Sequence, residues 1–148
     1  MLEERNARIE TELEVKAYIQ TLKYALKHGA QISFQVNRCV DDKRDEKYTN
    51  AYTVRKLFPN ENPTEALKRE LQTLTVENYM KTVKDLRFPK RSEMREFGKV
   101  YKGNEDVYIK IRVELLGQYG SATTFVMSFH FAEKKFTPDM FPYRKSGE

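Results

Sequence analysis

The sequence has a single cysteine, Cys39, and no apolar run near the roughly 20 residues needed to span a bilayer. One cysteine forms no disulfide within the chain, so we expect a reducing, cytoplasmic setting. The polar, acidic residues 1–5 differ from a secretory signal, and we expect no contact with a membrane. The sequence also lacks paired His or Cys ligands and a Gly-rich phosphate loop, so we expect no metal and no cofactor.

The composition is that of a folded protein with many surface charges. Of its 148 residues, 39% are hydrophobic and 33% are charged, which is typical of one globular domain over 1–148. Residues 81–112 hold ten Lys or Arg and five Asp or Glu, and this excess equals the net charge of the whole chain, +5. Such a stretch suggests a partner with phosphate groups, although a solvated surface without a partner produces the same pattern.

The first half of the chain has helical signals. An apolar stripe predicts one long helix over 1–28, which Gly29 ends; its members are Val15, Tyr18, Ile19, Leu22 and Leu26. Alternation predicts a strand over 31–36, and the charged residues 37–50 predict a loop. Asn62 and Pro63 are typical of a helix start. Thr75 looks like the cap of another short helix that carries Tyr79 and Lys81.

The second half has the alternation of strands. We predict strands over 95–101, 106–114 and 122–131, with a loop over 82–93 and a coiled tail that packs on the sheet. The fold class is therefore α+β, with N-terminal helices packed on a small antiparallel sheet. In the third strand, alternation predicts that Phe125 and Met127 face the helices, whereas Thr124 and Val126 face away.

The face turned away from the helices is predicted to be polar. If the second and third strands pair, it carries Tyr108, Lys110, Arg112, Ser128 and His130. These residue types suit cleavage of RNA without a metal ion, in which the ribose 2′-hydroxyl attacks the adjacent phosphorus. His130 could serve as acid or base, and cations could stabilise the charge on the phosphate. Lys and Arg on an exposed strand are also ordinary, so a basic binding module remains an equal alternative.

Five short motifs occur in the order found in a known family. They are Leu74-Thr75-Val76-Glu77-Asn78-Tyr79, Phe97-Gly98-Lys99, Val107-Tyr108-Ile109-Lys110, Ser128-Phe129-His130-Phe131-Ala132-Glu133 and Phe141-Pro142-Tyr143. In this series the chain resembles the MqsR-type toxins of bacterial type II toxin–antitoxin systems, in particular their Gram-positive branch. It departs from them in its extended N-terminal helix, its larger loop over 37–62 and an insertion over 115–121.

The resemblance implies a RelE-like fold with a curved sheet and an mRNA endoribonuclease, a hydrolase that a cognate antitoxin protein inhibits. We therefore expect single-stranded RNA and an antitoxin as partners, and the chain could also form a homodimer. The predicted catalytic residues are Lys81, Tyr108, Lys110 and His130, and the predicted substrate-binding residues are Arg95, Lys99 and Arg112. The alternative is a non-catalytic RNA- or protein-binding member of the same fold, carried by a mobile element.

Overall fold

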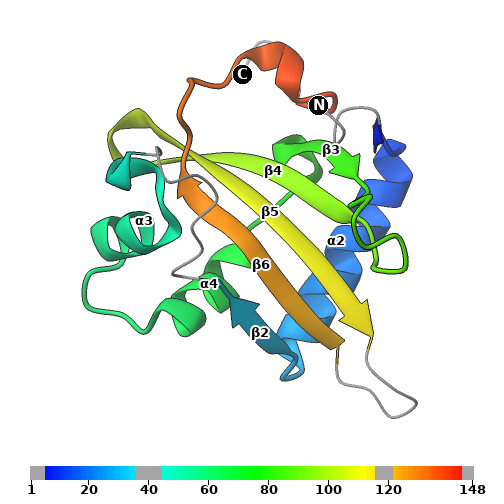
Figure 1. Ribbon diagram of the computed structural model, residues 1–148, viewed down its shortest axis with the longest axis horizontal. Coiled ribbons are helices and arrows are strands. Elements are labelled where there is room, and N and C mark those ends of the chain that lie inside the picture. Colours follow the sequence, from blue (N-terminus) through cyan, green and yellow to red (C-terminus); the bar gives the residue numbers. More distant parts are fainter. Residues whose placement is uncertain (1–5, 36–44, 116–121, 145–148) are drawn as a thin grey trace.

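The computed structural model describes residues 6–35, 45–115 and 122–144. They form an α+β fold, in which one long helix crosses behind a six-stranded sheet (Figure 1). The helices are α2 (Glu12–Lys27), α3 (Asn50–Leu57) and α4 (Pro63–Leu71). The strands are β1 (Ala7–Arg8), β2 (Gln31–Phe34), β3 (Tyr79–Val83), β4 (Met94–Tyr101), β5 (Glu105–Leu115) and β6 (Ala122–Phe131). The predicted class and the packing of the N-terminal helix on the sheet are confirmed.

The sheet is mixed rather than wholly antiparallel. Its strand order is β1-β3-β4-β5-β6-β2, and the predicted meander of β4, β5 and β6 lies at its centre. At one edge β2 runs parallel to β6, with Gln31 opposite Thr123. The chain between β2 and β6 forms helices and three other strands, and such a long connection permits parallel pairing, whereas a tight hairpin does not.

Helix α2 begins later than the sequence predicts. Thr11 stops the helix at its N-terminus, because its hydroxyl accepts a hydrogen bond from the Glu14 N–H (3.1 Å) and the Glu14 carboxylate accepts one from the Thr11 N–H (2.9 Å). Before this cap, Ala7–Arg8 pair with β3 as a short strand. The expected inner face is correct, because the core contains Val15, Ile19, Leu22 and Leu26.

Residues 79–83 form a strand, and the prediction of a short helix there is wrong. The helical signal at Thr75 closes only a single 3-10 turn, in which the Thr75 N–H donates to the Asn78 side chain at 2.9 Å. Tyr79, Thr82 and Val83 then favour extended backbone, since β-branched and aromatic side chains pack well on a sheet. As a result Lys81 lies within the sheet itself, beside β4.

The register of β5 against β6 shifts by one residue at Met127. Such a bulge reverses the alternation of side chains beyond it. Val126 and Thr124 therefore turn toward the helices and are fully buried, whereas Phe125 turns to the opposite side. The strict alternation predicted for this strand is correct at 128–131 and wrong at 124–127.

Asn50, the first residue of α3, fastens this bulge. Its amide nitrogen donates to the carbonyl oxygens of Met127 (3.2 Å) and Gln35 (2.8 Å). Its amide oxygen accepts from the Phe129 N–H at 3.0 Å. The side chain thus satisfies backbone groups at the irregular edge of the sheet, where β2 has ended. Of the predicted loop over 37–50, residues 37–44 lie outside the described residues, and the rest leads into this helix.

We predict that Asn50→Ala destabilises the protein by about 2–3 kcal/mol, because buried backbone groups lose their partners. Urea unfolding followed by circular dichroism measures this change. Lys56→Ala, at an exposed position of the same helix, should change the free energy of unfolding by less than about 0.5 kcal/mol. Equal stability of the two variants would contradict the role assigned to Asn50.

Candidate functional site

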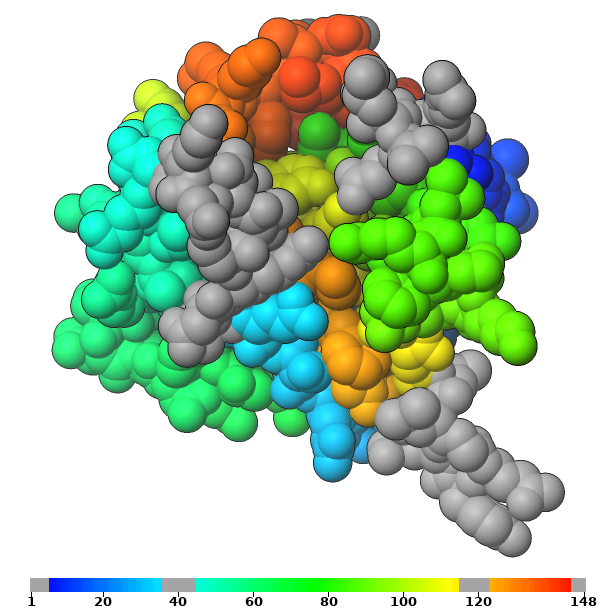
Figure 2. Space-filling view, viewed as in Figure 1, coloured from blue at the N-terminus to red at the C-terminus, as the bar shows by residue number. Residues whose placement is uncertain are grey.

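The side of the sheet away from α2 carries a group of polar and aromatic residues, called the polar face below. Its members are Lys81, Glu96, Tyr108, Lys110, Arg112, Phe125, Ser128 and His130. Figure 2 looks onto this side, where β5 in yellow and β6 in orange lie in a hollow between β2 and the green segment that joins β3 to β4. The polar face thus has a recessed floor and raised sides.

One row of the polar face crosses four strands. The register places Lys81 opposite Glu96, Glu96 opposite Lys110, and Lys110 opposite Ser128. Directly opposed side chains on neighbouring strands lie close enough to interact, and opposite charges there attract. Sequence reasoning did not select Glu96. The alternation with its buried neighbour Phe97 is the signal that would have placed it on this face.

The next row joins an aromatic ring to the imidazole. Tyr108 lies opposite His130, with ring centroids 5.3 Å apart and planes inclined by 43°. The Nδ1 atom of His130 lies 2.9 Å from the carbonyl oxygen of Phe131. Because a carbonyl only accepts, Nδ1 carries the proton, and in the neutral ring Nε2 then holds the lone pair.

Arg112 completes the polar face toward the end of β5. Its guanidinium lies 4.3 Å from the ring centroid of Phe125, which the bulge has turned to this side. It also pairs with the carboxylate of Glu114. Hydrogen bonds from the backbone and hydroxyl of Ser92, together with Arg112, lower the pKa of Glu114, although partial burial opposes this effect. The ionised carboxylate thereby fixes the loop before β4 onto β5.

That loop, residues 84–92, is called the basic loop below. It confirms the loop predicted over 82–93 except at 82 and 83, which belong to β3. Its exposed cations are Lys84, Arg87, Lys90 and Arg91. The exposed ring of Phe88 lies 3.8 Å from the guanidinium carbon of Arg91 and 5.8 Å from that of Arg87. The basic loop therefore presents guanidinium groups and an aromatic ring beside the polar face.

The structure places two of the predicted substrate-binding residues on the other side of the sheet. Arg95 faces α2, where its guanidinium donates to both carboxylate oxygens of Glu10 (2.9 and 3.1 Å) and lies 4.3 Å from the ring centroid of Tyr18. Lys99 also faces this side and contacts the hydroxyl of Thr73. The polar face thus brings Lys81, Tyr108, Lys110, Arg112 and His130 together, but not Arg95 or Lys99.

Glu10 is the centre of a buried polar cluster on the helix side. Besides Arg95, it accepts a hydrogen bond from the hydroxyl of Thr82 at 2.8 Å. Its backbone N–H donates to the hydroxyl of Tyr79 at 3.1 Å. Burial acts to raise the pKa of Glu10, but the bonds from Arg95 and Thr82 and the charge of Arg8 outweigh it and lower the pKa. The cluster joins the N-terminal segment to β3 and β4.

The C-terminal tail packs on the sheet as expected. A Cβ atom at Gly98 would lie 2.7 Å from the ring of Phe136 and 2.8 Å from that of Phe141. Gly98 stands opposite Tyr108, so these two rings border the polar face. Farther along, the ring of Tyr143 stacks on Tyr79 at a centroid distance of 6.1 Å.

No protein-family model, curated protein or solved structure matches this chain. In the described part of the chain, no helix is both long and apolar enough to cross a membrane.

We predict that Glu10→Gln lowers the free energy of unfolding at pH 7 by about 1–3 kcal/mol, because Arg95 loses a charged acceptor. The folded-state pKa of Glu10 lies below its unfolded value. Its stabilisation is therefore complete above the unfolded pKa and is lost as the pH falls through the folded pKa.

The stability of the parent should decline between about pH 5 and pH 3, and the stability of the variant should decline less over this range. Urea unfolding across this range measures both effects. Glu12→Gln, which removes an exposed carboxylate paired with Lys16, should change stability by at most about 0.5 kcal/mol. An unaltered pH profile for Glu10→Gln would contradict the assignment.

Proposed function

We propose that this protein is a toxin-like endoribonuclease that binds single-stranded mRNA on its polar face and cleaves it without a metal ion. The observation that carries the proposal is the arrangement of three side chains on neighbouring strands. Lys110 on β5 lies opposite Glu96 on β4. His130 on β6 lies diagonally across from Lys110, two residues beyond the residue that Lys110 faces. A carboxylate, an ammonium group and an imidazole are the groups that this chemistry requires.

The reaction needs two proton transfers and one site for negative charge. A base takes the proton of the ribose 2′-hydroxyl, whose oxygen bonds to phosphorus, while an acid protonates the departing 5′-oxygen. The product is a 2′,3′-cyclic phosphate and a free 5′-hydroxyl. Neighbouring strands lie about 4.8 Å apart and residues rise about 3.3 Å each along a strand, so the backbones at Glu96 and His130, two strands and two residues apart, are separated by roughly 12 Å. A phosphate in that space has room for one group on each side.

The remaining residues of the face have supporting roles in this proposal. Lys110, between the two proton-transfer groups, stabilises the charge on the phosphate oxygens, and Lys81 adds a second cation from β3. The ring of Tyr108 offers a surface on which a base stacks. The stacked pair of Arg112 and Phe125 extends this surface for the next nucleotide. RNA is favoured over DNA because the attacking group is the 2′-hydroxyl.

Two further observations support a nucleic-acid substrate. The motifs shared with MqsR-type toxins include Tyr108 and Lys110 on β5 and His130 on β6. The basic loop beside the polar face offers cations for phosphates and Phe88 for a base. In this proposal the protein acts in the cytoplasm, where mRNA is found, and an antitoxin protein keeps it inactive.

A second candidate is a non-catalytic RNA-binding protein of the same fold. The burial of the proposed catalytic groups favours it, since Glu96, Lys110 and His130 are exposed by only 6, 7 and 8%. Charged side chains buried so far also occur as structural layers within a sheet. In that case the exposed basic loop alone would contact RNA. The two candidates predict the same binding and differ in whether the strand is cut.

We predict that His130→Ala lowers the cleavage rate at least about 100-fold and that Lys110→Ala lowers it by about 10–100-fold, because a proton-transfer group and a stabilising cation are lost. Purified protein is incubated with a labelled single-stranded RNA in the presence of EDTA, and the cyclic phosphate ends are identified by mass spectrometry.

Lys99→Ala is the matched control, since this lysine lies one strand away but on the helix side. It should retain at least about half of the parent rate. Circular dichroism verifies that each variant is folded. Intact RNA after incubation with the parent, together with tight binding, would reject the nuclease and leave the second candidate.

A further prediction concerns the basic loop. Replacing both Lys84 and Lys90 by Ala should weaken RNA binding irrespective of sequence, and each lost phosphate contact should reduce the slope of log K against log salt by about 0.7. Phe88→Ala should weaken binding by about 1–3 kcal/mol through lost stacking.

Fluorescence anisotropy of a labelled RNA at several salt concentrations measures both effects. Lys27→Ala, at the exposed end of α2, is the control and should leave the slope unchanged. A loop variant that binds RNA as the parent does would show that the basic loop is not part of the RNA path.

A further inference from the structure

Helix α2 has large apolar side chains on its outer surface as well as on its inner one. Leu13 is 78% exposed and Tyr24 is 68% exposed, and both lie on the side of the helix that faces away from the core. Ala17 and Gln20 lie between them at helical spacing and are also exposed. Isolated exposed apolar residues are common, but Leu13 and Ala17 also adjoin the apolar wall of a groove, and a contiguous apolar surface marks a contact site.

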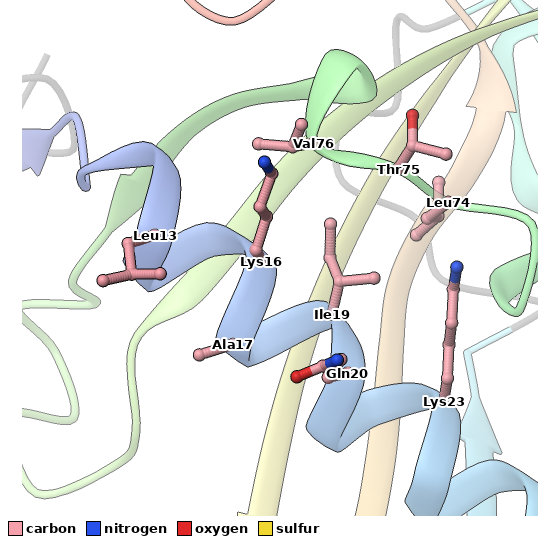
Figure 3. Close-up of a pocket in the computed structure, with 9 residues that line it drawn as sticks. All are labelled: Leu13, Lys16, Ala17, Ile19, Gln20, Lys23, Leu74, Thr75 and Val76. Carbon is pink, nitrogen blue, oxygen red and sulfur yellow. The ribbon is translucent and has the colours of Figure 1, made fainter.

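This row borders a groove of about 480 Å³ between α2 and the segment that precedes β3. Figure 3 shows Ile19 pointing from the helix toward Leu74 and Val76 on the opposite wall. Leu13 lies at one end of the groove. Because the groove runs beside the helix and is open to solvent, it can accommodate an elongated partner that lies along α2.

The two charged residues that line the groove are both lysines. Two ammonium groups, those of Lys16 and Lys23, stand on either side of Ile19 in Figure 3. No carboxylate is among the residues that line the groove. Lys23 follows Lys16 by seven positions, which amounts to about two helical turns, or about 10.5 Å along the axis. Lys16 also pairs with Glu12 at 3.0 Å on the same helix.

We propose that this groove binds an amphipathic helix of a partner protein, with an apolar stripe that covers Leu13, Ile19 and Leu74. Carboxylates two turns apart on the partner helix pair with Lys16 and Lys23. Helices commonly bind in grooves of this kind through apolar residues at spacings of three and four, with charges on the flanks setting the choice of partner.

The charges favour this occupant over two others. A second copy of the chain would bring Lys16 and Lys23 against the same lysines across a two-fold axis, and like charges there repel. Nucleic acid would meet the lysines but would leave the apolar wall of Ile19, Leu74 and Val76 without a matching surface. The groove lies on the helix side of the sheet, so this inference is independent of the function proposed for the polar face.

The probe is a synthetic helical peptide of about 15 residues, with a leucine stripe and two Glu seven positions apart. The control peptide has Lys in place of both Glu. The chain contains no Trp, so a single Trp in each peptide reports binding through its fluorescence. The acidic peptide should bind saturably to the full-length protein, and the basic peptide at least about five-fold more weakly at low salt.

Three variants at exposed or half-buried positions test the contacts. Lys23→Glu should lower the affinity for the acidic peptide and raise the affinity for the basic peptide by about five-fold each. Leu13→Ser should lower both affinities. Lys56→Glu, on α3, should leave both affinities unchanged. Equal binding of the two peptides, or no saturable binding of the acidic one, overturns the proposal. So does a concentration-dependent dimer in sedimentation that Leu13→Ser dissolves, because the groove would then serve a second copy.

Discussion

Strand β6 carries apolar side chains at 125, 126, 127, 129 and 131, and regular alternation would send those at 125, 127, 129 and 131 to one side and Val126 to the other. The bulge at Met127 breaks this alternation, so that Val126 and Phe129 both enter the core. The same shift turns Phe125 outward, where Arg112 stacks on it. Without the bulge, either the core would lose Val126 or the polar face would lose His130. The site therefore depends on an irregularity in the sheet.

The bulge in turn depends on Asn50. An extra residue in a strand leaves backbone groups without partners in the ladder, and buried groups of this kind are costly. A side-chain amide has both donors and an acceptor, so it can replace a short piece of neighbouring strand. Asn50 does this from the start of α3, just where β2 ends. Thr53, one turn later, also stands in for a neighbouring strand, because its hydroxyl accepts a hydrogen bond from the Phe131 N–H.

The sheet separates two kinds of buried charge. On the helix side, Glu10 and Arg95 form a two-bond ion pair, and Thr82 supplies a further donor to the carboxylate. A pair with this many bonds offsets its own desolvation and holds the N-terminal segment in place. On the polar face, among the described residues, Arg112 is held by the carboxylate of Glu114 and an aromatic ring, next to an open hollow (Figure 2). The second arrangement leaves more donor groups for a ligand.

Short-range patterns in the sequence predicted those parts of the fold that local chemistry determines. Asn62 caps α4 as expected, and Gly29 takes a positive φ of 87° where α2 ends. The faces of β5 also follow from alternation alone. Arg95 and Lys99 have the same parity as the apolar Phe97, so alternation in β4 alone places them on the helix side and places Glu96 on the polar face. The motif resemblance assigned Arg95 and Lys99 to the substrate instead.

Other parts depended on contacts between distant segments. Helix α3 has only eight residues and a weak apolar pattern, and it is held by the bonds of Asn50 and Thr53 to β6. Strand β3 follows a segment whose sequence is typical of a helix start. The strand forms nevertheless, because it pairs with β4 on one side and with Ala7–Arg8 on the other. In both cases the local preference for a type of secondary structure does not decide the outcome, because the hydrogen bonds that decide it come from residues far away in the chain.

The two proposed surfaces lie on opposite sides of the same sheet. A partner helix along α2 would leave the polar face accessible, so it would not inhibit cleavage by covering the site. Any influence on RNA would have to pass through the sheet. One such connection runs from Tyr18 of α2 to Arg95, whose neighbour in β4 is Glu96. Because Arg95 is held by Glu10 as well, a small displacement of α2 would be resisted by that ion pair, and we expect the two surfaces to act independently.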